Sequence, residues 1–216
     1  MTKKRGRPPA TGSPRQQKRS RRNTGIPGWL LPAAVVVVLA VIAVVVVAVS
    51  QGGSTSSSRP SPTAATGQTV DGIQCETHEQ VLFHIHAHLA IFVNGQEEQV
   101  PPGIGIPDPQ VQQTQGGPFV ASGSCFYWLH THATDGIIHI EAPAQRTFTL
   151  GNLYDIWGQP LSASRAGGDT GQVIAYVDGK RFDGDPRTIP LGAHTVIQLD
   201  VGTDVPFRPY TFAPNV

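Results

Sequence analysis

One apolar run without a single charged residue, residues 29–49, constrains the fold more than any other feature of this sequence. At about 1.5 Å rise per residue, its 21 residues make a helix about 31 Å long, which is enough to cross the hydrocarbon core of a bilayer. Valine is a mediocre helix former in water, but in lipid the cost of an unpaired backbone amide overrides that preference. We therefore expect a transmembrane helix over residues 29–49.

The distribution of basic residues predicts the orientation of this helix. Nine of the 16 lysines and arginines lie before position 23, whereas only Arg59 follows the apolar run closely. The positive-inside rule then places residues 1–28, a basic disordered tail, in the cytoplasm beside anionic lipid head groups. The chain after the helix is expected to be extracytoplasmic, which makes the protein a single-pass protein of the cell membrane.

Two other interpretations of the N-terminal segment stay open. A cleaved signal peptide also begins with basic residues, and Ala48-Val49-Ser50 loosely resembles a small-residue cleavage site, although the apolar run is long for that purpose. The segment Lys4–Pro8 resembles an AT-hook, an arginine-bearing arm that enters the minor groove of DNA. Five residues are a weak match, so nucleic acid is not the expected partner.

The chain after the apolar run divides into a stalk and a domain. Residues 50–68 are rich in Ser, Thr, Pro and Gly and offer almost nothing to bury, so we expect a flexible stalk. Residues 69–216 then form the extracytoplasmic domain, which is acidic because 6 basic and 15 acidic residues lie from position 67 onward. Its short alternating runs predict a mainly β domain, with α+β as the alternative and one short helix over residues 149–157.

Six of the eight histidines lie in two alternating tracts. The first tract, Val81–Val93, predicts a strand with an unbroken apolar face at odd positions and with His84, His86 and His88 together at even positions. Histidines two residues apart on a strand lie about 6.5 to 7 Å apart at Cα on the same side. From that spacing both rings can reach one metal ion.

The second tract, residues 126–141, predicts two strands joined by a tight Asp-Gly turn. With a two-residue loop, His132 lies opposite His139, and His130 lies opposite Glu141, all on one face. A four-residue loop keeps the three histidines together, whereas a three-residue loop turns His139 to the far side.

Together the two tracts predict one shared transition-metal site. The candidate ligands are His84, His86, His88, His130, His132, His139 and Glu141. Imidazole with carboxylate suits zinc or copper, and iron, nickel or manganese also fit. A lone methionine at position 1 excludes a blue-copper site with a methionine ligand, and two cysteines are too few for a zinc ribbon. His78 stands outside the pattern, and His194 joins only if the last strand lies beside the others.

Cys75 and Cys125 each precede one of the histidine tracts. In the oxidising space outside the membrane they are expected to form a disulfide bond. Such a bond would pin the two histidine strands side by side, which supports a single shared site. Thiolate ligands to the metal are the alternative.

Three classes of function are compatible with these residues. The leading interpretation is a membrane-anchored domain that binds a transition metal for sensing, storage or delivery. The second is a metal-dependent enzyme, in which three histidines leave a coordination position open for water and Glu141 acts as the general base. The third is a metal-free binding or structural domain whose histidines respond to acidity.

Several motifs resemble a set of uncharacterised membrane-anchored bacterial and archaeal proteins. The likeness rests on Leu129-His130-Thr131-His132, Gly136–Glu141, Thr149-Leu150-Gly151 and Asp155–Leu161, with His84-Ile85-His86 and Ile189-Pro190-Leu191. The resemblance implies an anchored outer domain and no particular activity. In that set an acidic residue often follows the His-Thr-His segment, but Ala133 stands there in this chain, so Asp135 or Glu141 would have to substitute in an enzyme.

Overall fold

The computed structural model describes residues 66–214 and 216. The predicted basic tail, the transmembrane helix over residues 29–49 and the stalk up to residue 65 lie outside the described residues. Within the described ranges, no helix combines the length and the apolar character needed to cross a membrane.

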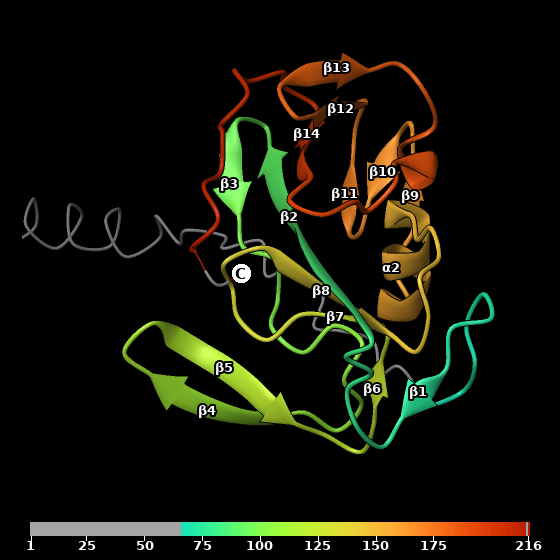
Figure 1. Cartoon of the computed structure of the whole chain (residues 1–216). Helices are drawn as coiled ribbons and strands as arrows, with labels where there is room; N and C mark the ends of the chain where they lie inside the picture. Colours follow the sequence, from blue (N-terminus) through green and yellow to red (C-terminus); the bar gives the residue numbers. More distant parts are fainter. Residues whose placement is uncertain (1–65, 215) are drawn as a thin grey trace, which may run out of the picture. The chain divides into compact units, whose positions relative to one another are not determined.

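Strands dominate the described part of the chain, which contains one α-helix (Figure 1). The main sheet consists of β2 (Phe83–Val93), β3 (Gln96–Glu98), β7 (Leu129–His130), β8 (Ile137–Ala142), β12 (Val173–Val177), β13 (Lys180–Phe182) and β14 (Val196–Val201). The smaller sheets pair β1 (Cys75–Glu76) with β6 (Phe126–Tyr127), β4 (Gln110–Thr114) with β5 (Gly117–Ser122), and β10 (Arg165–Ala166) with both β9 (Leu161–Ser162) and β11 (Asp169–Thr170). The helical elements are α2 (Leu150–Trp157) and the 3-10 helix η1 (Pro186–Thr188). The prediction of a strand-rich region with one short helix is confirmed.

The order of strands in the main sheet is β13-β12-β14-β2-β8-β7, and β3 pairs with the last three residues of β2. All neighbours run antiparallel except β14 and β2, which run parallel. β8 lies between β2 and β7 and pairs with both. The first tract therefore pairs directly with the second through β2 and β8, where His86 lies opposite His139.

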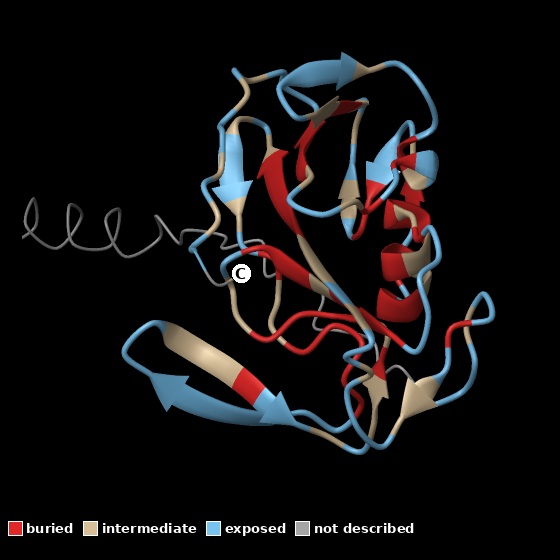
Figure 2. Cartoon of the chain, viewed as in Figure 1, coloured by how far each residue is buried: buried red, intermediate tan, exposed pale blue. Residues whose placement is uncertain are grey.

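The two faces of the sheet differ because successive side chains of β2 point to opposite sides. Odd positions such as Ala87, Leu89 and Ile91 point into the core and are almost completely buried. They belong to one hydrophobic cluster with helix α2, whose buried side chains include Leu153 and Trp157. Figure 2 shows that most of α2 and part of β2 are buried. Even positions face the other way, so the histidines of β2 share their face with the polar side chains of β8.

Helix α2 begins and ends at residues that satisfy its free backbone groups. Thr149 accepts a hydrogen bond from the Asn152 backbone N–H, and the Asn152 side chain accepts one from the Thr149 backbone N–H in return. Gly158 ends the helix in the left-handed conformation, which glycine adopts without steric cost. The helix thereby packs its apolar side against the core face of the sheet.

The connection between β7 and β8 differs from the predicted hairpin. His130 lies opposite His139, and residues 131–136 form the loop, so the predicted pairing of His132 with His139 across a two-residue turn is wrong. The observed register differs from the predicted one by two residues, and an even shift keeps every side chain on its face. Gly136 has a φ of 78°, and a Cβ there would lie 2.4 Å from a backbone carbonyl oxygen of β2. The loop therefore needs glycine at this position.

Cys75 and Cys125 form a disulfide bond, as predicted. The bond joins β1 to the residue before β6, and these two short strands pair with each other. It does not pin the histidine strands side by side, because β8 separates β2 from β7. No described cysteine is free, so thiolate ligands are excluded.

Candidate metal centre

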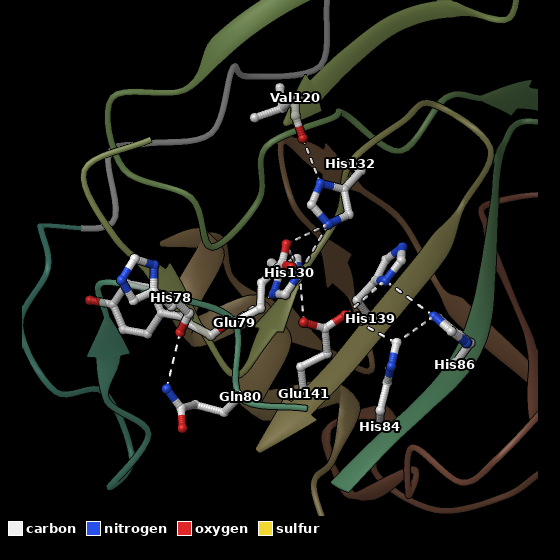
Figure 3. Close-up of polar contacts among 11 residues, drawn as sticks. His78, Glu79, Gln80, His84, His86, Val120, His130, His132, His139 and Glu141 are labelled. Atoms are coloured by element: carbon white, nitrogen blue, oxygen red, sulfur yellow. Dashed lines mark hydrogen bonds and ion pairs between the residues drawn. The ribbon is translucent and has the colours of Figure 1, made fainter. Parts of the chain in front are cut away.

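Five imidazoles and two carboxylates of the described residues converge on the polar face of the sheet (Figure 3). They are His84 and His86 of β2, His139 and Glu141 of β8, His130 of β7, His132 in the following loop, and Glu79 before β2. Their potential ligand atoms form three overlapping sets, within each of which all atoms lie within 4.8 Å of one another. His139 belongs to both sets that contain only histidines, so the two predicted tracts do converge.

We call His84, His86, His139 and Glu141 the first group. His86 Nε2 lies 3.1 Å from His84 Nε2 and 3.1 Å from His139 Nδ1. Glu141 Oε1 closes the ring at 3.0 Å from His84 Nε2 and 3.3 Å from His139 Nδ1. Ligand atoms that bind one tetrahedral ion at about 2.05 Å are about 3.3 Å apart. The four contacts around this ring are therefore close to the separation expected in a four-coordinate site, and His84, His86 and His139 form one set of mutually close ligand atoms.

We call His130, His132, Glu79 and Glu141 the second group. His130 Nε2 and His132 Nε2 are 3.2 Å apart. Glu79 Oε1 lies 3.3 Å from His132 Nε2 and 3.9 Å from His130 Nε2. Glu141 faces this group with its other oxygen, because Oε2 lies 3.9 Å from His130 Nε2. The Glu141 carboxylate therefore directs one oxygen toward each group.

Two backbone carbonyls determine which nitrogen of each buried ring carries the proton. His130 Nδ1 lies 2.8 Å from the Tyr127 carbonyl oxygen, and His132 Nδ1 lies 2.5 Å from the Val120 carbonyl oxygen. A carbonyl oxygen only accepts, so each Nδ1 donates the hydrogen bond and carries the proton. In its neutral form each ring then has a bare lone pair at Nε2, and these two nitrogens face each other (Figure 3). Metal-binding histidines have the same arrangement.

The surroundings of the centre favour neutral imidazoles and an ionised carboxylate. Complete burial, together with the neighbouring His132, lowers the pKa of His130 to about 3. Partial burial and the nearby His139 ring lower the pKa of His86 to about 4. Burial opposes ionisation of Glu141, but its hydrogen bond with His139 and the other nearby rings outweigh burial and lower the pKa of Glu141. These are the protonation states that bind a divalent metal.

Comparison with protein-family models, with curated proteins and with solved structures finds no match for this chain. The resemblance of residues 129–132 and 136–141 to a membrane-anchored set of proteins therefore remains a prediction. In the structure these two segments supply three histidines and Glu141 to the centre.

His88 is a predicted ligand that lies outside both groups. Its ring stacks on Tyr210, with ring centroids 3.7 Å apart, and burial lowers its pKa. It lines a separate pocket further along β2. His78 is exposed, and the ring of His194 contacts a backbone carbonyl near the C-terminus. Neither residue belongs to a group of potential ligands.

Glu79 is a member of the centre that the sequence pattern did not indicate. It lies in the loop before β2, outside both alternating tracts, so periodicity provides no signal for it. The predicted disulfide does provide one, because Glu79 follows Cys75 by four residues and that cysteine is bonded to the segment that leads into His130. An acidic residue close to either cysteine is therefore a candidate neighbour of the second tract.

We expect the metal-free protein to lose stability as the pH falls below about 6.5, the ordinary pKa of histidine. His86 and His130 bind protons more weakly in the folded state than in the unfolded chain, so acid favours unfolding until the pH reaches their folded pKa values of about 4 and about 3. Thermal unfolding of chelator-treated protein between pH 7 and pH 4 measures this loss. His86→Gln removes one of the titrating rings and should make the melting temperature less dependent on pH. An unchanged pH dependence would contradict the assignment of His86 as one of the groups that cause the loss.

Proposed function

We propose that this protein is a membrane-anchored, extracytoplasmic domain that binds a divalent transition metal for sensing, storage or delivery. The main support for metal binding is the chemical composition of the second group. With both Nδ1 protons directed to carbonyls, His130 and His132 present only acceptor nitrogens, and Glu79 and Glu141 add only acceptor oxygens. Acceptors gathered around one space repel one another unless a cation lies between them.

The first group supports the same proposal and argues against catalysis. Three imidazole nitrogens and one carboxylate oxygen suit zinc or copper, with iron, nickel or manganese as alternatives. A shell of four protein ligands suits storage or delivery better than catalysis, which needs an open coordination position. Both oxygens of Glu141 face imidazole rings, which supports a role as a ligand over a role as the general base of an enzyme.

The proposed location rests on the sequence and on one structural feature. The apolar run over residues 29–49 and the basic residues before it support an anchored topology with the domain outside. The bond between Cys75 and Cys125 supports an oxidising compartment. The basic tail is then proposed to contact anionic lipid head groups on the cytoplasmic side.

Adding Zn²⁺ or Cu²⁺ to purified, metal-free, full-length protein should raise its melting temperature. A ligand that binds only the folded state stabilises it by about 4 kcal/mol at a thousand times its Kd. Scanning calorimetry with and without metal measures this, alongside elemental analysis of the protein as purified. Mg²⁺ is the control, because it prefers oxygen ligands and should change little.

A different outcome would favour another function. If the purified protein contains no metal and its melting temperature is unchanged by Zn²⁺ and Cu²⁺, the metal proposal fails. The metal-free, acid-responsive domain would then be the remaining interpretation, with the neutral rings of His86 and His130 as its titrating groups.

A further inference from the structure

We propose that the centre holds two metal ions and that Glu141 bridges them. This inference rests on the proposed metal-binding function and specifies how many ions the cluster takes. Five imidazoles and two carboxylates are too many ligands for one zinc ion, which takes four in most protein sites. The first group already provides four ligand atoms, so the remaining residues form a second set.

Glu141 connects the two sets through its two oxygens. Oε1 lies in the first group, at 3.0 Å from His84 Nε2. Oε2 is buried and has no hydrogen-bond partner among residues 66–214 and 216, and it lies 3.9 Å from His130 Nε2. A buried carboxylate oxygen without a partner is energetically unfavourable, and a cation bound on the side of the second group would compensate it. A carboxylate that binds one ion through each oxygen satisfies both sides.

A second ion would satisfy the other unpaired acceptors of that group as well. His130 and His132 already donate their Nδ1 protons to backbone carbonyls, which orients both Nε2 lone pairs into the same space. Two-metal sites in proteins hold their ions about 3.5 to 4 Å apart, a separation that one carboxylate can span. Two divalent ions also compensate the negative charge of the Glu79 and Glu141 carboxylates.

Glu79 is the ligand that distinguishes the second ion from the first. In the part of the chain that the structure describes, its ion pairs are with His130 and His132 of the second group. Its side chain is 37% exposed, whereas that of His130 is completely buried. Solvent therefore reaches the second group beside Glu79. We expect the second ion to enter and leave there, and to depend on this carboxylate for its affinity.

The zinc stoichiometry of the full-length protein, measured by equilibrium dialysis and elemental analysis, tests the second site. The wild-type chain should bind two ions, and Glu79→Gln should retain about one. Glu97→Gln is the matched control, because it removes the same charge from β3, where Glu97 pairs with Arg208 away from the centre, and it should keep both ions.

The possible results separate the two proposals. One ion in the wild-type chain would overturn the second site and leave the metal-binding function intact, whereas no bound zinc would overturn both. Two ions in Glu79→Gln would overturn the assignment of the second ion to this group.

Loading with Cu²⁺ tests the bridge itself. Two Cu²⁺ ions joined by one carboxylate couple magnetically, so the electron paramagnetic resonance intensity should fall below that of two isolated ions. Glu141→Gln, which keeps the shape of the side chain but removes the bridging charge, should abolish the coupling. Full intensity from two uncoupled ions in the wild-type protein would overturn the bridge.

Discussion

His139→Ala is expected to cause a large loss of metal affinity. His139 Nδ1 lies 3.1 Å from His86 Nε2, and His139 also belongs to the set that contains His130 and His132. Loss of a residue that merely orients a ligand costs about 10- to 100-fold in metal affinity, so loss of His139, which is itself a ligand of the first group, should cost on the order of a hundredfold or more. Competition of the protein with a chromophoric zinc chelator measures the change.

His194→Ala is the matched control for this substitution. The His194 backbone N–H donates to the His86 carbonyl, so this histidine also lies beside β2, but its ring stacks on Phe212 and belongs to neither group. Removing its ring takes away an imidazole near the centre without taking away a ligand, and the zinc affinity should be unchanged. Equal losses in His139→Ala and His194→Ala would mean that zinc is captured by histidines without a defined site.

The polar face of the centre could be predicted because a strand alternates. The apolar odd positions of Val81–Val93 must face the core, which leaves His84 and His86 on the other side. In the second tract the predicted loop length was wrong, but the predicted face was still correct. The observed pairing of His130 with His139 differs from the predicted one by an even number of residues, which leaves each side chain on its face. The face of the sheet on which each side chain lies was therefore predictable, whereas the pairing register of the strands was not.

The order of strands in the sheet could not be predicted from the spacing of residues, and neither could the distant segment that covers part of β2. The hairpin pattern predicts that β8 pairs with β7, but nothing in the sequence indicates that β8 also pairs with β2, which is what brings Glu141 between the two groups. His88 follows the same alternation as His86, yet the C-terminal segment lies over that part of β2 and Tyr210 stacks on its ring. Tertiary packing determines which of the alternating histidines come into contact, and the alternation in the sequence alone does not predict it.

Replacing Cys75 and Cys125 with serine should lower the free energy of unfolding by about 4 kcal/mol. The bond links residues 50 positions apart, and the chain-entropy model assigns a loop of that length about this value. Urea unfolding of the metal-free, full-length protein measures the difference between the double variant and the wild type. A difference below about 1 kcal/mol would mean that the disulfide bond restrains the unfolded chain little.

The same double variant should weaken the two groups unequally under conditions in which it remains folded. Cys75 lies in β1, four residues before Glu79, whereas His84, His86 and His139 are held by the pairing of β2 with β8. Loss of the bond therefore loosens the loop that carries the Glu79 ligand and leaves the first group in place. Zinc titration should show one affinity reduced and one retained. Equal reduction of both would show that the bond supports the whole sheet, and two unchanged affinities would show that the short β1 and β6 pair positions Glu79 without it.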